Sequence, residues 1–221
     1  MSMQKTPGFD TPQLRWNRRL GSLISKNLID RGHDARYVDT KQEAKQTVLD
    51  IIPANASVGV PGTVTIREIG AVDALIGRGN RLVQHWLPSS SKEEKNAQLS
   101  GELTCDFFLT SSNAITKDGI LVNMDGRGNR LAGMCWGTGT IVYVIGLNKV
   151  CENLESAILR VQNYASPLNA LRLGVDFAEE NEISFRKNKA LQNIGRILLI
   201  TEQAPMGRDS RVILVGESCG Y

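Results

Sequence analysis

The run Ile141–Ile145 (IVYVI) has no charged side chain and consists mainly of β-branched residues. Such strands are typical of the centre of a parallel sheet, where both faces are buried. Ser57–Val60 and Cys105–Leu109 are two further near-continuous apolar runs, and helix-like segments separate the three. An alternation of strand and helix places parallel strands in one sheet with helices on its faces. The sequence therefore predicts a three-layer α/β/α fold with a mainly parallel sheet.

The rest of the chain is consistent with a single domain of 221 residues (1–221). An amphipathic helix is predicted over about 11–31, because its leucines recur at helical spacing. Residues 174–190 are charged and weakly patterned, which predicts an exposed insertion. The last two apolar runs, RILLITEQ and RVILVGES, are expected to form a closing pair of strands at a sheet edge or in a small β subregion.

Charge and hydropathy exclude several classes of protein. Lys and Arg number 26 against 23 Asp and Glu, and a net charge of +3 is too small to indicate binding to nucleic acid or an anionic membrane. No apolar run approaches the roughly 20 residues of a membrane span. The first residues lack the apolar region of a secretory signal. We therefore expect a soluble cytoplasmic protein.

The cysteines and histidines do not predict a metal site. Cys105, Cys135, Cys151 and Cys219 are far apart and form no CxxC pair. We expect four reduced thiols, no bound metal and no cofactor. His33 and His85 are isolated in the sequence. A surface or strand-end imidazole is the commoner role for such histidines.

A first glycine-rich loop lies in the segment SVGVPGTVTIREIG, between a strand and a helix. The backbone N–H groups of Gly62, Thr63 and Val64, with the hydroxyls of Thr63 and Thr65, are placed to bind an anion. An alternative needs no ligand. Thr65 and Glu68 match the T-x-x-E capping box, which starts a helix by itself. The sequence leaves both interpretations open.

A second glycine-rich stretch follows the strand CDFFLTSS. It contains Asp125 and Gly126, which predict a tight turn, and then Arg127 and Arg130. Lys149 follows the next strand. A parallel sheet would place these three cations at one carboxyl-end rim, where they favour a phosphate or carboxylate. The alternative is a simple turn whose arginines point into solvent.

Taken together, these segments resemble the LUD domain family, which is named for lactate utilization. The resemblance runs from Asn17 to Tyr221 through VGVPGTVTIREIGAVDAL, DFFLTSSNAITKDGILVNMDGRGNRLAG, IVYVIGLNKV, AILRVQNYASPLNALRL and RVILVGESCGY. The family is similar to the isomerase/CoA-transferase-like folds, in which a glycine turn holds a phosphate. In those folds an A-I-x-x-x-G-x-V-N stretch lies near the reactive end of the substrate, and NAITKDGILVN is similar to it.

The resemblance implies a cleft that binds a small anionic metabolite, whether phosphorylated, carboxylated or CoA-linked. The implied anion-binding residues are Gly62, Thr63, Val64, Thr65, Asn113, Gly126, Asn129, Arg130, Asn148 and Lys149. Glu68, Asp118 and Asp125 are the carboxylates implied as base or nucleophile, with Glu68 and Asp125 preferred. Arg130 is expected at the rim of the cleft, where its loss would leave the fold intact.

Two roles remain open. The first is an enzyme or enzyme component in the utilization of lactate or a related organic acid. The second is a non-catalytic accessory or sensor subunit that docks an iron–sulfur oxidoreductase. The chain has no histidine after His85 and lacks the C-terminal His-Gly-Pro of the lactate-oxidation branch. No nucleophile–base pair is visible, which favours the second role. The sequence leaves open whether the protein forms homo-oligomers.

Overall fold

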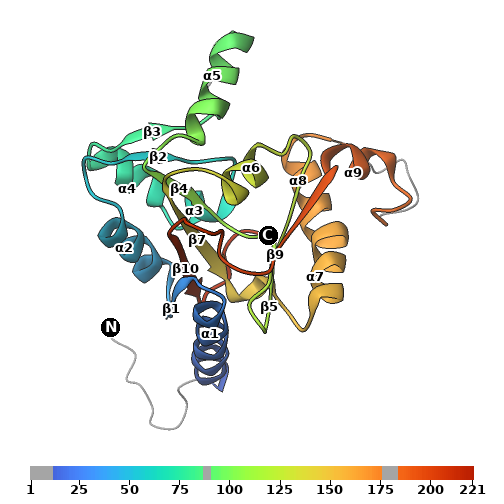
Figure 1. Cartoon of the computed structure of the whole chain (residues 1–221). Helices are drawn as coiled ribbons and strands as arrows, with labels where there is room; N and C mark the ends of the chain where they lie inside the picture. The colour runs from blue at the N-terminus through green and yellow to red at the C-terminus, as the bar shows by residue number, and fades with distance from the viewer. Residues whose placement is uncertain (1–11, 87–90, 176–183) are drawn as a thin grey trace, which may run out of the picture.

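The central sheet of the protein has six parallel strands in the order β1-β10-β7-β4-β2-β3. The computed structural model describes residues 12–86, 91–175 and 184–221 (Figure 1). In sheet order the strands are β1 (Asp34–Val38), β10 (Ser210–Val215), β7 (Thr140–Gly146), β4 (Phe107–Thr110), β2 (Ser57–Gly59) and β3 (Arg81–Val83). The predicted parallel sheet is therefore confirmed, with the β-branched run as its interior strand β7.

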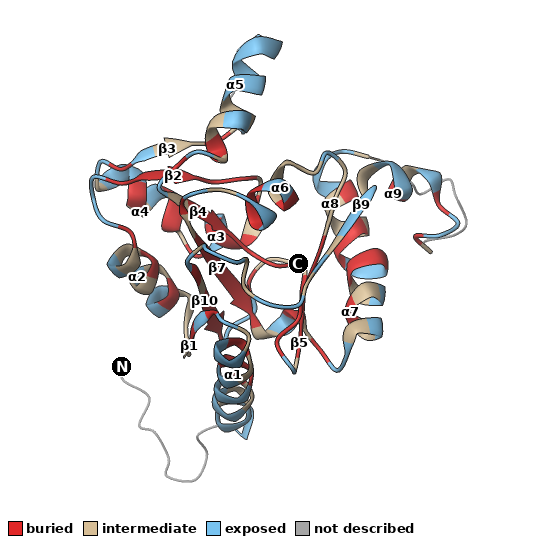
Figure 2. Cartoon of the chain, in the orientation of Figure 1, coloured by how far each residue is buried: buried red, intermediate tan, exposed pale blue. Residues whose placement is uncertain are grey.

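Side chains of β7 alternate between two core layers. Val142 and Val144 pack on one face of the sheet with residues of α2 (Lys41–Ile51), α3 (Val64–Glu68) and α4 (Ala71–Gly77). Ile141, Tyr143 and Ile145 pack on the other face with residues of α1 (Pro12–Asp30) and α6 (Asn129–Cys135). All five side chains are fully buried. Helices on both faces complete the three layers (Figure 2).

A second, smaller sheet has the order β8-β5-β6-β9. Its strands are β8 (Val150–Cys151), β5 (Ala114–Thr116), β6 (Leu121–Asp125) and β9 (Ile197–Thr201). β6 runs antiparallel to both β5 and β9. The connected helices α7 (Leu154–Arg160), the π-helical turn Val161–Ala165 and α8 (Ser166–Arg172) follow β8. Ala157 and Val161 of this helical segment pack on Ala114 and Val122 of the small sheet.

The prediction that the last two strands form a closing pair is wrong, because β9 and β10 belong to different sheets. β9 pairs with β6, and β10 lies between β1 and β7. Their burial explains the difference. The side chains Val212 to Val215 of β10 are buried on both faces, as an interior strand requires, whereas Ile197, Leu198 and Ile200 of β9 are 36–45% exposed.

The segment predicted as an exposed insertion, 174–190, lies partly outside the described residues. Of the described part, Phe185 and Asn188 are buried. Phe185 packs with Ala170 and with Leu191 of α9 (Lys189–Ile194) in a small cluster. This part of the segment therefore anchors to the body instead of standing in solvent. The helix that does project is α5 (Lys92–Glu102), at the top of Figure 1.

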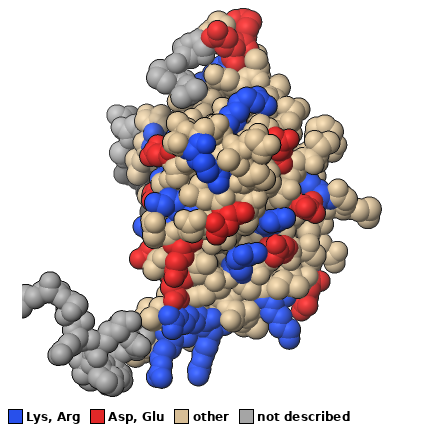
Figure 3. Space-filling view, turned by 90° about the vertical axis from the view of Figure 1, so that its left-hand side faces the viewer, with Lys and Arg blue, Asp and Glu red and all other residues tan. Residues whose placement is uncertain are grey.

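No helix within the described residues combines the length and the apolar character that a membrane crossing needs. On the face drawn in Figure 3, basic and acidic side chains are interspersed, so that face carries no large field of one sign.

Candidate functional site

A cavity of about 600 Å³ opens where both glycine-rich loops meet the carboxyl ends of the strands. Gly62 to Thr65 follow β2, and Lys149 follows β7; Asp125 and Gly126 lie where β6 ends. The two loops therefore share one cavity. The predicted site residues that line it are Gly62, Thr63, Val64, Thr65, Asn113, Asp125, Gly126, Asn129, Arg130 and Lys149.

The capping box that was the alternative interpretation of the first loop is not formed. Thr63 is the N-cap residue of α3, and its side chain makes no capping hydrogen bond. The Thr65 hydroxyl instead accepts a hydrogen bond from Lys149 Nζ at 2.8 Å. Glu68 accepts one from the Gly220 N–H at 2.6 Å. Because these partners lie more than 80 residues away, the T-x-x-E pattern serves tertiary contacts and not helix initiation.

Lys149 is the most buried cation of the cavity wall, with 2% of its surface exposed. Its Nζ donates to Thr65 Oγ1 and, at 3.0 Å, to Ser111 Oγ. No carboxylate within the described residues forms an ion pair with it. Burial, helped by the nearby charges of Arg160 and Arg130, lowers the pKa of Lys149 to about 7.

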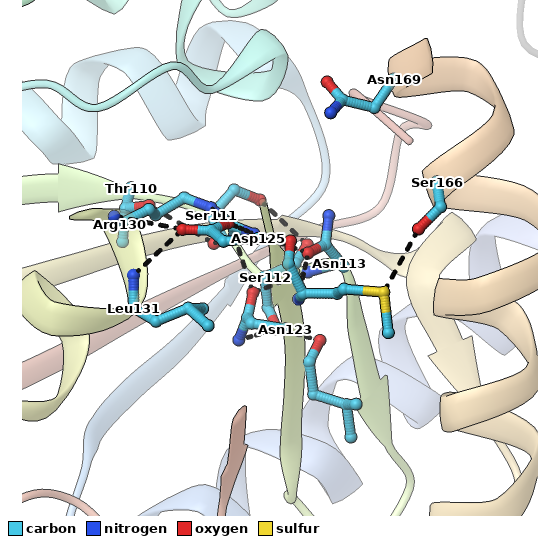
Figure 4. A network of polar contacts seen from close by, with 12 residues as sticks. Thr110, Ser111, Ser112, Asn113, Asn123, Asp125, Arg130, Leu131, Ser166 and Asn169 are labelled. Carbon is cyan, nitrogen blue, oxygen red and sulfur yellow. Dashed lines mark hydrogen bonds and ion pairs between the residues drawn. The ribbon is translucent and has the colours of Figure 1, made fainter. Parts of the chain in front are cut away.

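Arg130 and Asp125 form the polar network shown in Figure 4. Asp125 Oδ1 accepts from Arg130 Nε at 3.0 Å and from Nη2 at 2.7 Å. Its Oδ2 accepts from the backbone N–H groups of Arg130 and Leu131 in the first turn of α6. The carboxylate is thereby committed to the guanidinium and to the helix, which leaves Asp125 poorly suited to act as a base.

Arg130 is not the rim arginine that the sequence predicted, because only 11% of its side chain is exposed. It donates to Asn123 Oδ1 at 2.8 Å and to Asn113 Oδ1 at 2.7 Å. Asn113 Oδ1 in turn accepts from the Met124 N–H, and Asn123 Oδ1 from the Asn113 N–H. Asn113 and Asn123 of the second stretch therefore hold the Arg130 side chain in place.

Exposed cations complete the positive lining of the cavity. Lys95, Arg127, Arg172 and Arg196 are all exposed and line it. Arg127 has no polar partner among the described residues. Arg172 lies over the Trp86 ring at 4.5 Å and donates to Tyr221 Oη at 2.8 Å.

His85 and Glu102 form a pair that the sequence did not predict. His85 Nδ1 lies 2.6 Å from Glu102 Oε1, which also accepts from the His85 backbone N–H at 2.9 Å. The Glu102 side chain is fully buried, and its Oε2 has no hydrogen-bond partner among the described residues. His85 lines the cavity together with Trp86. The pair joins the end of β3 to the end of α5, 17 residues apart in sequence, and no short motif signals it.

Three other predicted residues lie away from the cavity. Asn148 donates to the Gly220 carbonyl and accepts from the Cys219 N–H. With Glu68 it holds the last residues of the chain, which place Tyr221 in the cavity wall. Asp118 pairs with Arg31 at 3.1 Å and is largely exposed. None of Glu68, Asp118 and Asn148 lines the cavity.

The four cysteines are unpaired. Cys105, Cys151 and Cys219 are buried and Cys135 is exposed. No group of three or more His, Cys, Asp or Glu side chains within the described ranges is arranged to hold a metal ion.

A parallel α/β sheet with a polar, cation-lined cavity at the carboxyl ends of its strands defines the class of α/β proteins with a ligand cleft at that edge. The LUD domain model matches residues 22–215, so the chain belongs to the LUD domain family. The fold is similar to the crystal structure of a DUF162 family protein from Deinococcus radiodurans, with a TM-score of 0.53 and 14% identity over 90% of this chain and 98% of that one. No curated protein matches the chain.

Proposed function

We propose that the cavity binds a small metabolite that carries a carboxylate or phosphate group, within the utilization of lactate or a related organic acid. The observation that carries the proposal is the charge of the lining. Besides the buried Lys149, five Lys and Arg side chains line the cavity (Lys95, Arg127, Arg130, Arg172 and Arg196) against one carboxylate, that of Asp125. Because Asp125 is committed to Arg130, the remaining positive charge has no counter-charge in the lining.

The size of the cavity supports the same proposal. Its volume of about 600 Å³ lies within the roughly 300–1,000 Å³ of small-molecule sites. Hydroxyl and amide groups of Ser111, Ser112, Asn129 and Asn169 accompany the cations in the lining. Such groups orient a polar ligand while the cations supply charge-assisted hydrogen bonds, each contributing roughly 1.5–3 kcal/mol.

Arg127 gives the direct test, since it is exposed, unpartnered among the described residues and part of the lining. A thermal-shift screen with lactate, pyruvate, sugar phosphates, CoA esters and folates identifies a ligand, because specific binding raises apparent stability. Calorimetry of the best ligand then compares Arg127→Ala with Arg19→Ala, which removes an equal charge from the exposed face of α1. We expect Arg127→Ala to weaken binding about tenfold and Arg19→Ala to leave it unchanged. Equal affinities of the two variants would contradict the proposal.

Catalysis is favoured over pure binding by the His85–Glu102 pair. A buried carboxylate that fixes one ring nitrogen of a histidine leaves the other nitrogen for proton transfer, and His85 lines the cavity. Docking of an iron–sulfur oxidoreductase stays a prediction.

A further inference from the structure

Lys149 is a buried lysine whose amine is hydrogen-bonded to hydroxyl groups and not to a carboxylate. Buried lysines are almost always paired with a carboxylate, because an uncompensated buried charge costs several kcal/mol. Lys149 is instead held by two neutral hydroxyls, those of Thr65 and Ser111. The one carboxylate near it, Glu68, is bound to the Gly220 N–H. The site therefore favours a neutral amine.

Nζ of Lys149 also has a bonding position that no described residue occupies. Two hydrogen bonds from Nζ are present in the structure, and no other described residue is bonded to it. Lys149 belongs to the wall of the cavity, so a ligand bound there lies beside this residue, although only 2% of its surface is exposed. The two hydroxyls fix the direction of the amine, since Thr65 and Ser111 both lie in the same wall.

We infer that Lys149 is a nucleophilic amine that forms an imine with a small carbonyl compound carrying an anionic group. The inference rests on the proposed function, because it requires Arg127 and Arg172 of the cavity lining to bind the anionic group of the same compound. The chemistry is that of a 2-oxo acid or of a phosphorylated aldehyde or ketone. Both present a carbonyl carbon close to a negative charge.

The step needs no oxidant or reductant. The lone pair of the neutral Nζ forms a bond to the carbonyl carbon, and the carbonyl π electrons move to oxygen. Both protons of the amine are transferred in turn to that oxygen, which leaves as water, and a C=N bond remains. The lowered pKa of Lys149 supports this chemistry, since a pKa of about 7 raises the neutral fraction at pH 7 roughly a thousandfold over that of a free lysine.

Reductive trapping tests the inference on the intact chain. The protein is incubated at pH 7 with sodium cyanoborohydride and pyruvate, or with dihydroxyacetone phosphate, and digested for peptide mass spectrometry. The two arms separate a carboxylate from a phosphate as the anionic group. Acetone serves as a carbonyl without charge, and lactate as an anion without a carbonyl. We expect one adduct in at least one anionic carbonyl arm, on the peptide that contains Lys149, at least about tenfold above every other lysine.

Two variants accompany the peptide map. Lys149→Met should abolish the adduct, whereas Lys26→Met, on the exposed face of α1, should leave it unchanged. If Lys149→Met does not fold, the map of the unaltered protein decides, because its other lysines are internal controls. Binding of either probe by calorimetry without an adduct on Lys149, or an adduct spread evenly over the lysines, overturns the inference and leaves the proposed function standing. Absence of both binding and adduct, with every ligand screened, overturns both.

Discussion

Replacing Arg130 with alanine should destabilise the fold, although Arg130 lines the cavity. Its guanidinium makes two hydrogen bonds to Asp125 Oδ1 and one each to Asn113 Oδ1, Asn123 Oδ1 and the Met124 carbonyl. Both charged side chains are only 11% exposed. Removing one partner of a buried ion pair typically costs about 3–5 kcal/mol, because the other charge stays buried.

The structure favours the lower end of that range. Without Arg130 the Asp125 carboxylate keeps the two N–H groups of α6, and each asparagine oxygen keeps one backbone donor. Water can also enter from the cavity. We therefore expect Arg130→Ala to lower the free energy of unfolding by about 3 kcal/mol.

Urea denaturation followed by circular dichroism measures this loss. With a slope of roughly 2–3 kcal/mol per molar urea, the midpoint should fall by about 1 M or more. Arg127→Ala is the matched control, three residues before Arg130 in the sequence. Because Arg127 is exposed, this variant should change stability by less than about 0.5 kcal/mol. A loss below about 1 kcal/mol for Arg130→Ala, or equal losses for the two variants, would refute the assignment of Arg130 to the framework of the site.

Two further outcomes follow from single residues, His33 and Gly62. Burial lowers the pKa of His33 to about 4, so the unfolded chain binds the proton more tightly and stability falls as pH drops from about 6.5 towards 4. Urea unfolding should show a loss of about 2 kcal/mol between pH 7.5 and pH 5 that His33→Gln removes; an unchanged pH dependence in the variant would contradict it. A Cβ at Gly62 would overlap the Trp86 indole, so Gly62→Ala should change tryptophan fluorescence and ligand affinity, whereas Gly77→Ala, with open space around it, should change neither.

Local sequence patterns predicted the elements whose residues are all buried to the same degree, as in Ile141–Ile145 of β7. The β-branched run over β7 is buried on both faces, and its composition follows from that burial. Thr40 and Glu43 form the capping box that starts α2, and there the local pattern and the structure agree. The same pattern at Thr65 and Glu68 fails, because Lys149 and Gly220 compete for those side chains from distant parts of the chain.

The polar contacts of Arg130 and of His85 could not be predicted from the sequence, because they join residues that no short motif links. Arg127 and Arg130 lie three residues apart in one glycine-rich stretch, and contacts with Asn113, which precedes β5, and Asn123 of β6 decide which of the two is buried. The His85–Glu102 pair depends on how α5 leaves β3 and returns to the sheet. Neither arrangement has a spacing that a single sequence reveals. The resemblance to the LUD domain family predicted that the two glycine-rich loops share a cleft, but it did not predict which side chains pair within that cleft.

The position of β10 has a consequence for how the chain is made. β10 is the one strand of the described sheet that pairs with β1, and it joins β1 to β7. A ribosome releases residues 34–38 long before residues 210–215, so β1 waits through most of synthesis without a partner. Long-range pairing of this kind slows folding and prolongs the exposure of unpaired strand edges. Premature termination before Ser210 would remove two strands from the sheet, because β1 would lose its place along with β10.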